Sequence, residues 1–428
     1  MMQVKARKTC RVCGSKNLIP IMSLGEQFVT NFVDDPKKRF ESGPLDLVLC
    51  NVKDGGCGLL QLKHTVERDV LYTKYWYRSG ISKMMVDALA DIALAGAKLT
   101  KLRSGDLVID IGANDGTLLR QYNIPGLRTV GFEPSDLWKF ATKGTTKIIN
   151  DYFNSNAFKK EYGTEKAKLI TSISMFYDLE DPNTFVEDVK KCLAEEGVWI
   201  IQMNYLGLML KNNTFDNICH EHLEYYSLMS LENLLDRHAL EAFDVELNDV
   251  NGGSFRIYIR HKGSSVKGFA GSKERIEQQK IYEAKKGFDD SKVYGKFAKR
   301  IEKIKKDLFT FLKQERKKGK RIFIYGASTR GLVVLQYAGI DHNLIEAAAD
   351  MNPEKWGKYI VSTGIQIISI AQYRKEKPDY LFVLPYHFLE EIKEQEKEFL
   401  KTGGKLIVAI PKFEVLSNGQ CGALQTPD

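Results

Sequence analysis

A buried strand that runs directly into an acidic residue and a glycine-rich turn is the feature that most constrains this chain. An apolar run at residues 107–109 leads into Asp110, Gly112 and Gly116, and Thr117 then opens a predicted helix. Glycines let the backbone come close to a ligand, and the N-terminus of a helix supplies N–H groups that have no partner within the helix. The segment therefore predicts a ligand-binding strand–loop–helix unit.

A second acidic residue follows in register with the first. Glu133 stands at the end of the next predicted strand, residues 129–132, where a carboxylate can accept hydrogen bonds from ribose hydroxyls. The glycines do not follow the G-x-G-x-x-G pattern of dinucleotide sites, so a nucleoside without a pyrophosphate is favoured, and S-adenosylmethionine is the natural candidate. A turn followed by core aromatic residues is the alternative for positions 151 and 152. The expected donor-site residues are Asp110, Gly112, Asn114, Asp115, Gly116, Glu133, Pro134, Asp151 and Tyr152.

The composition is that of an ordinary folded protein with room for two or three domains. The chain has 428 residues, of which 43% are hydrophobic and 28% are charged. It contains no apolar run near the roughly 20 residues that span a bilayer, and no apolar segment follows its basic first residues. We therefore expect no membrane partner and a cytoplasmic location. The net charge of +8 suits an anionic substrate such as a sugar nucleotide, and it would also suit nucleic acid.

Much of the excess positive charge lies between Lys299 and Lys320. Apolar residues recur in and before this stretch at spacings of three and four, which predicts an amphipathic helix whose basic side faces solvent. The alternative is a nucleic-acid-binding surface, but aromatic residues are not interleaved with the basic ones as base stacking requires. We expect no nucleic-acid partner, and a monomer or a weak homo-oligomer.

Four of the seven cysteines lie near the N-terminus. Cys10 and Cys13 have the C-x-x-C spacing from which two thiolates reach one metal across a tight turn, and Cys50 and Cys57 form a second pair. Four thiolates complete a tetrahedral zinc site with no open position, which is structural rather than catalytic. The second pair is more widely spaced than usual, and the two glycines inside it would let that loop fold back.

Three regions follow one another along the chain: a small zinc-binding module at residues 1–65, a methyl-donor domain at 66–265 and a C-terminal domain at 266–428. In the second region predicted strands alternate with helices, which implies an α/β fold with a parallel sheet covered on both faces, as in a Rossmann-like class I methyltransferase. The predicted strands are 107–110, 129–132, 169–173 and 198–202, followed by a late antiparallel strand within 252–259.

The C-terminal region repeats the strand–glycine–helix pattern at residues 321–331 and predicts a second doubly wound α/β domain. Gly326 and Gly331 alone are a weak cofactor signal. A site at the helix N-terminus for the diphosphate of a substrate is therefore favoured over NAD.

Seven short motifs occur in an order that is specific when they are taken together. They are residues 10–14 (CRVCG), 75–80 (YWYRSG), 110–116 (DIGANDG), 131–135 (GFEPS), 215–222 (FDNICHEH), 252–256 (GGSFR) and 325–331 (YGASTRG). In these motifs and in its domain order the chain resembles, nearly end to end, the sugar-nucleotide C-methyltransferases of deoxysugar pathways, of the 3-C-methyltransferase type. The resemblance implies an N-terminal zinc domain, a central S-adenosylmethionine domain and a C-terminal α/β domain without a second cofactor.

The resemblance also implies a reaction, the addition of a methyl group to C3 of an NDP-4-keto-6-deoxy sugar that lies between the domains. Removing the proton beside the ketone needs a general base, and the enolate oxygen needs a hydrogen-bond donor. His222 corresponds to the family's proposed base and Glu221 to the acidic residue beside it. A packed histidine and a His220/His222 metal pair are the alternatives, since in an extended chain both histidines would project to one side. Tyr75 and Tyr77 are expected to face the sugar, with interdomain packing as their alternative.

Two departures from the family leave the sugar and the methylated position open. Members often carry a tyrosine in place of Cys219 and a histidine in place of Tyr177, so a weak thiol donor stands where a hydroxyl would face the enolate. An O-methyltransferase acting on a nucleotide-linked sugar or heptose is the first alternative, followed by an RNA-directed methyltransferase and a non-catalytic scaffold. The further substrate contacts expected are Arg78, Ser79, Asn204, Tyr205, Tyr325, Gly326, Ser328 and Arg330.

Overall fold

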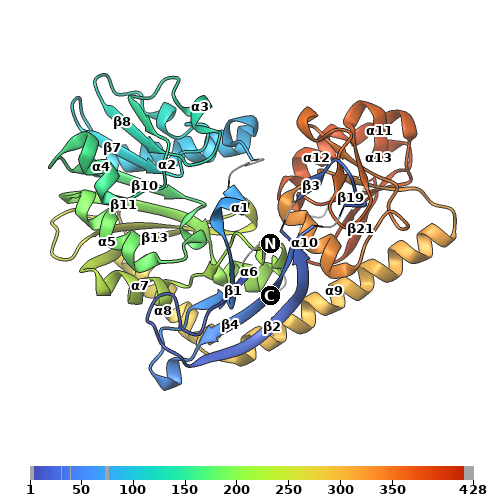
Figure 1. The fold of residues 1–428 in the computed structure, drawn as a ribbon, viewed down its shortest axis with the longest axis horizontal. Coiled ribbons are helices and arrows are strands. Elements are labelled where there is room, and N and C mark those ends of the chain that lie inside the picture. The colour runs from blue at the N-terminus through green and yellow to red at the C-terminus, as the bar shows by residue number, and fades with distance from the viewer. Residues whose placement is uncertain (1–3, 30, 39, 73–76, 419–428) are drawn as a thin grey trace.

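The computed structural model describes residues 4–29, 31–38, 40–72 and 77–418. Figure 1 shows two lobes, one formed by the central part of the chain and one by its C-terminal part. N-terminal strands and a long helix run below and between the lobes, so the N-terminal region connects them.

The zinc-binding module is a long antiparallel hairpin extended by short strands. One four-stranded sheet has the order β12-β5-β4-β2, and its strand β12 comes from the central part of the chain. A two-stranded ladder joins β1 to β6. The elements are β1 (Val4–Ala6), β2 (Leu18–Phe28), β3 (Phe32–Val33), β4 (Ser42–Cys50), η1 (Val52–Asp54), β5 (Leu60–Leu62), β6 (His64–Val66), α1 (Arg68–Tyr72), η2 (Ser79–Ile81) and β12 (Glu224–Tyr225).

The central domain is built on seven strands in the order β13-β14-β11-β10-β7-β8-β9. The strands from β11 to β9 are parallel, and β14 runs antiparallel to both of its neighbours, which confirms the late antiparallel strand. The strands are β7 (Leu107–Ile111), β8 (Arg128–Phe132), β9 (Lys147–Ile149), β10 (Ala167–Ile173), β11 (Leu193–Asn204), β13 (Leu240–Asn248) and β14 (Ser254–His261). The helices are α2 (Lys83–Thr100), α3 (Trp138–Ala141), α4 (Ser155–Tyr162), α5 (Pro182–Cys192), α6 (Leu206–Asn212) and α7 (Leu228–Arg237), with short 3₁₀ helices η3 (Leu119–Gln121), η4 (Phe176–Asp178), η5 (Phe215–Asn217) and η6 (Val250–Gly252).

Both faces of this sheet are buried, because side chains alternate along each strand. Val108, Leu169 and Ile200 pack with Leu89 and Ile92 of α2 on one face. The residues that follow these three strand positions belong to the core on the other face. The strands therefore read as continuous apolar runs, as expected of a parallel sheet covered on both sides.

The prediction of a helix that begins at Thr117 is wrong, because the structure has only the short 3₁₀ helix η3 there. Pro125 follows within two turns, and a proline disfavours helical backbone at the residue before it. The segment between β7 and η3, residues 112–118, is called the donor loop below. It is shaped by turns and glycines rather than by the start of a long helix.

The C-terminal domain confirms the second doubly wound fold. Its parallel strands have the order β18-β16-β15-β19-β20, and β17, β3 and β21 add antiparallel edges. The loops after β15 and β19 flank the point where the strand order reverses, which is where such sheets bind ligands. The elements are β15 (Ile322–Tyr325), α10 (Thr329–Ala338), β16 (Ala347–Asp350), η7 (Pro353–Lys355), β17 (Tyr359–Ile360), β18 (Gln366–Ser369), α11 (Ile370–Glu376), β19 (Tyr380–Val383), η8 (Tyr386–Phe388), α12 (Leu389–Gln395), α13 (Lys397–Lys401), β20 (Lys405–Val408) and β21 (Glu414–Leu416).

Two helices lie between the domains in sequence. α8 (Ser272–Lys286) packs against the central domain, where Arg275 forms an ion pair with Asp244 of β13 at 2.7 Å. α9 (Ser291–Lys317) runs beneath both lobes in Figure 1 and buries an apolar stripe, as its spacing predicts. Across the parts of the chain that the structure describes, no helix combines the length and the apolar character needed to cross a bilayer.

Candidate active site

A cavity of about 790 Å³ opens at the carboxyl ends of β7, β8 and β10. Parallel strands end side by side, so the loops that follow them face one shared space. The donor loop lies on one wall, and residues of the zinc-binding module and of the 220–223 turn lie on others. The predicted site residues that line the cavity are Tyr77, Ser79, Asp110, Gly112, Asn114, Glu133, Pro134, Tyr152 and Glu221.

Negative side chains predominate in the lining. Among the described lining residues the cationic ones are Lys5 and Arg68. The carboxyl groups of the lining belong to Glu67, Asp110, Glu133, Asp178, Glu180, Asp181, Asp188 and Glu221. Opposite charges attract strongly where water is partly excluded, so this cavity suits a cationic ligand such as a sulfonium compound.

Left-handed backbone at three positions shapes the donor loop. Gly112, Asn114 and Gly116 have φ angles of +74°, +52° and +77°. A Cβ on Gly116 would lie 2.9 Å from the Cα of Ala141, so this glycine is required by packing against α3. Gly116 and Asp115 are not among the cavity-lining residues, whereas Gly112 and Asn114 are.

Backbone hydrogen bonds fix the carboxylate of Glu133 at the end of β8. Its two carboxylate oxygens accept hydrogen bonds from the backbone N–H groups of Asn114 (2.7 Å) and Ser135 (2.9 Å). Burial raises the pKa of Glu133, while these hydrogen bonds favour its charged form. The carboxylate is thus fixed in the wall of the cavity.

Asp110 lies deeper in the same wall and is 3% exposed. Its Oδ1 accepts a hydrogen bond from the Thr171 hydroxyl at 2.6 Å. Burial, together with the nearby charge of Glu133, raises the pKa of Asp110 to about 7. A cation bound in the cavity would therefore draw Asp110 into its ionised form.

Asn114 and Asp115 fasten a second segment of the chain onto the donor loop. Asn114 Nδ2 donates to the Tyr77 carbonyl (3.1 Å), and Asn114 Oδ1 accepts from the Ser79 N–H (3.0 Å). Asp115 Oδ2 accepts from the Gly80 N–H at 2.9 Å. Asn114 and Asp115 thus act as a latch that holds residues 77–80 against the donor loop.

Asp151 and Tyr152, which were expected to border the adenine, lie in the loop that follows β9. Tyr152 lines the cavity, and the guanidinium carbon of Arg68 lies 3.8 Å from its ring centroid. Asp151 is exposed and accepts from the Tyr152 N–H at 2.7 Å. Pro134 lines the cavity while its carbonyl accepts from Asn150 at 3.2 Å.

His222 lies in a turn, so the extended conformation expected around it is wrong. Its N–H donates to the Cys219 carbonyl at 3.1 Å, and the two neighbouring histidines diverge. His220 Nε2 donates to the Gly43 carbonyl (3.0 Å), whereas His222 Nδ1 donates to the Asn217 carbonyl (2.9 Å). Because the two rings bond to separate carbonyls, the paired histidine site has no support; within the described residues, the group of three or more side chains that could hold a metal is the four cysteines.

The environment of His222 keeps its ring uncharged. Burial first and the charge of Arg330 second lower the pKa of His222 to about 3. Because Nδ1 carries the proton that the Asn217 carbonyl accepts, Nε2 carries the lone pair. The ring centroid lies 4.3 Å from that of Tyr177. His222 is therefore neutral at pH 7, with a lone pair on Nε2, but at so low a pKa it is a weak base in the ligand-free protein, and it is not among the residues that line the cavity.

Arg330 reaches from the start of α10 to the central domain. It forms an ion pair with Asp216 at 2.6 Å and donates to the Asn251 carbonyl at 2.9 Å and the Tyr386 hydroxyl at 3.1 Å. In the described part of the chain, Arg330 Nε and His387 Nδ1 are buried without a hydrogen-bond partner. Asn251 also lines the cavity, so this polar cluster adjoins it.

Several residues predicted to bind substrate are engaged elsewhere. Tyr205 is 1% exposed and donates to Glu283 at 2.9 Å, and Tyr325 is 4% exposed and donates to Gln395 at 2.9 Å. The Tyr205 hydroxyl therefore ties the central domain to α8, and the Tyr325 hydroxyl supports packing within the C-terminal domain.

The other predicted contacts stabilise loops. Ser328 caps α10 by accepting from the Gly331 N–H at 3.0 Å, and a Cβ on Gly326 would lie 2.7 Å from the ring of Pro385. Asn204 donates to the Asn251 carbonyl at 3.1 Å. Arg78 lies over the ring of Phe140 at 4.0 Å. Tyr75 falls outside the described residues, and its role stays a prediction.

Sequence reasoning missed three members of the Arg330 cluster: Asp216, Tyr386 and His387. The rule that ligands gather at strand ends could have found the last two, because they stand in the segment that follows β19. Asp216 stands inside the quoted 215–222 motif, but only the fold brings it to Arg330.

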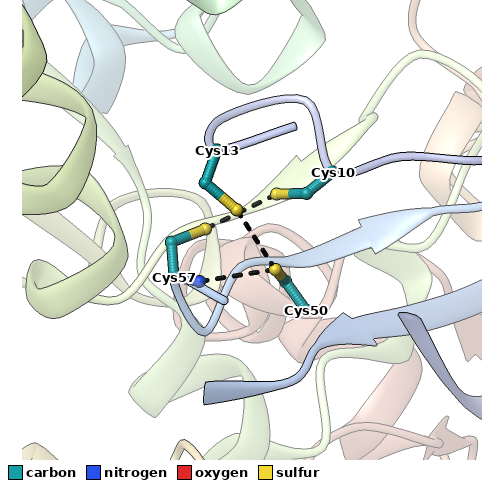
Figure 2. Close-up of side chains that lie close together, drawn as sticks. All are labelled: Cys10, Cys13, Cys50 and Cys57. Carbon is teal, nitrogen blue, oxygen red and sulfur yellow. Dashed lines mark hydrogen bonds between the residues drawn. The ribbon is translucent and has the colours of Figure 1, made fainter. Parts of the chain in front are cut away.

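The four N-terminal cysteines converge from two loops, as Figure 2 shows. Their sulfur atoms all lie within 4.8 Å of one another, with Cys10–Cys57 at 3.5 Å and Cys13–Cys50 at 3.4 Å. A Cβ on Gly56 would lie 2.5 Å from Cys50 Sγ, so a glycine is what allows the wider second loop to close. The donor set fits zinc, and with four thiolates no coordination position is left for chemistry.

Known proteins match this organisation region by region. A zinc binding domain model matches residues 10–72, a methyltransferase domain model matches residues 81–244, and a C-methyltransferase C-terminal domain model matches residues 249–411. The C-methyltransferase NovU of Streptomyces niveus is 30% identical over 414 residues, which cover 95% of this chain and 96% of that protein. The chain belongs to this C-methyltransferase family. It is therefore an S-adenosylmethionine-dependent methyltransferase with a zinc-binding domain.

Solved structures resemble the methyltransferase only weakly. The mitomycin 7-O-methyltransferase MmcR is 14% identical with a TM-score of 0.34, over 42% of this chain and 55% of that one. An S-adenosylmethionine-dependent methyltransferase from Clostridium acetobutylicum ATCC 824 is 15% identical with a TM-score of 0.33, over 42% of this chain and 92% of that one. The family assignment rests on the domain models and on NovU.

Proposed function

We propose that the methyltransferase places a methyl group on C3 of an NDP-4-keto-6-deoxy sugar through an enolate, with His222 as the general base. S-adenosylmethionine supplies an electrophilic methyl group. The observation that carries the proposal is the state of His222, whose Nδ1 proton is taken by the Asn217 carbonyl and whose Nε2 is left with a lone pair. The step moves the C3 proton to Nε2, and the C3–methyl bond then forms as S-adenosylhomocysteine leaves.

The charge distribution supports a division of the ligands between two places. The acid-lined cavity favours the cationic donor and a neutral sugar ring, whereas the diphosphate of a sugar nucleotide needs cations. Arg330, with its unpartnered Nε, and the neighbouring His387 supply donors at the domain junction. Burial is the larger cause of the low pKa of His222 and the charge of Arg330 the smaller one; an anion bound there would offset the Arg330 charge, and so strengthen the base when the acceptor is bound.

A hydroxyl near the base is needed for the enolate oxygen. Burial raises the pKa of Cys219, which keeps it a thiol and a weak donor. Tyr77 lines the cavity and Tyr177 packs on His222, so we assign the donor to one of these two tyrosines. Glu221 also lines the cavity, and we assign it to a sugar hydroxyl.

Product analysis tests the proposal. The enzyme is incubated with methyl-¹³C S-adenosylmethionine and a panel of NDP-4-keto-6-deoxy sugars, and the labelled position is read by NMR. We expect the label on C3. A label on oxygen would support the O-methyltransferase alternative, and the absence of product with every sugar nucleotide would reject the substrate class.

A further inference from the structure

Arg11 stands between the first two zinc ligands, in the loop that carries Cys10 and Cys13 in Figure 2, and its side chain bonds to residues outside the cysteine cluster. The side chain has 0% exposure. Its Nη1 donates to the Leu62 carbonyl at 2.6 Å, and its Nη2 donates to the Thr65 hydroxyl at 2.7 Å. Its Nε donates to Glu180 Oε2 at 3.3 Å.

Two of these partners belong to the wall of the cavity. Thr65 and Glu180 both line it, and the Thr65 hydroxyl donates to Glu180 Oε2 at 2.7 Å. Arg7 holds the other carboxylate oxygen of Glu180 at 2.6 Å. The position of Glu180 is therefore set from the zinc-binding module, although it belongs to the central domain.

The backbone of the zinc loop is tied to the same wall. Asn183, in the first turn of α5, donates through Nδ2 to the carbonyls of Arg11 (3.0 Å) and Val12 (2.9 Å). Asp181, which caps the N-terminus of α5, also lines the cavity. Ligation of cysteines on both sides of Arg11 would fix its backbone, and the guanidinium, with five donors in a rigid fork, carries that geometry to Glu180.

We propose that Arg11 is a positioning residue that couples the zinc site to the acceptor-side wall of the active site. Thr65, Glu180 and Asp181, which form this wall, line the same cavity as Gly112, Asn114 and Glu133 but come from other segments of the chain. The proposal rests on the proposed function in one respect, that the nucleotide sugar occupies this side of the cavity. Zinc then shapes the acceptor pocket as well as holding its module together.

The test compares Arg11→Met and Arg11→Lys with Glu180→Gln and with the control Lys16→Met, an exposed residue of the same module. Zinc per chain, the Kd for S-adenosylmethionine, the KM for the acceptor and amide hydrogen exchange over residues 178–184 are measured in each. We expect Arg11→Met to keep one zinc and its donor affinity. Its acceptor KM should rise by about tenfold, and exchange over 178–184 should quicken. Arg11→Lys should behave much like Arg11→Met, because an ammonium group cannot replace the several donors of a guanidinium. Glu180→Gln should raise the acceptor KM and leave the zinc content unchanged.

Three results would overturn the proposal. They are loss of zinc from Arg11→Met, an equal weakening of donor affinity, or exchange and KM values no different from those of Lys16→Met. Glu180 lies outside the zinc loop, so its variant still tests the coupling if Arg11→Met fails to fold. The exchange and zinc measurements need no acceptor, so they decide on Arg11 even if the sugar-nucleotide substrate is wrong.

Discussion

Replacing Asn114 by glycine should weaken acceptor use while sparing donor binding. The substitution is free of backbone strain, because Asn114 has a φ of +52°, a conformation that glycine adopts readily. It removes the hydrogen bonds to the Tyr77 carbonyl and the Ser79 N–H. The backbone N–H that fixes Glu133 is retained, so this carboxylate, the predicted ribose ligand, keeps its place.

The size of the effect follows from the two lost hydrogen bonds. Each neutral bond contributes about 0.5–1.5 kcal/mol, so docking of residues 77–80 weakens by about 1–3 kcal/mol, or about 5- to 160-fold in its equilibrium constant. Tyr77 and Ser79 of this segment line the cavity, so undocking would take them out of its wall. We therefore expect kcat/KM for the nucleotide sugar to fall by a factor within that range.

The assay pairs calorimetric Kd values for S-adenosylmethionine with acceptor kinetics at saturating donor. Asn114→Asp is the matched control, because aspartate tolerates the same backbone and keeps an oxygen for the Ser79 N–H. It should fall between the wild type and Asn114→Gly. If donor affinity drops as much as acceptor kcat/KM, Asn114 is a donor ligand and not a latch, and the reasoning fails.

Three further predictions follow from the site. The affinity for S-adenosylmethionine should rise about tenfold per pH unit up to about pH 7 and then level off, because the cationic donor favours ionised Asp110. Titration calorimetry should find this rise in the wild type and not in Asp110→Asn. At saturating donor, the acid limb of acceptor kcat/KM should contain no step near pH 6.5, because His222 in the free enzyme stays neutral down to about pH 3; a step at 6.5 would contradict its burial. Cys13→Ser should lower both the zinc content and the Tm, as atomic absorption and calorimetry would show, whereas an unchanged Tm would mean that the module folds without metal.

The sequence was sufficient where one local pattern determined the structure. The parallel strands of both α/β domains were readable because their buried runs are apolar on both faces, and the zinc site because four thiolates share one chemistry. The late antiparallel strand was readable in the same way.

Contacts between segments far apart in the chain were not readable. Asn114 was assigned to the donor, yet its side chain holds the segment at 77–80, which no spacing rule predicts. His220 and His222 diverge because a tight turn replaces the extended chain that alternation assumed. Tyr205 carries a polar group like any ligand contact, and only the fold shows that its hydroxyl is buried against Glu283.

Hydrogen exchange at C3 of the sugar tests the central claim most directly. The wild-type enzyme and His222→Ala are each incubated in D₂O with an NDP-4-keto-6-deoxy sugar and no methyl donor, and loss of the C3 proton signal is followed by NMR. If His222 forms the enolate, the wild type should exchange this proton and the variant should not, while both bind S-adenosylmethionine equally. Equal exchange in both proteins, or none in an active wild type, would contradict the account.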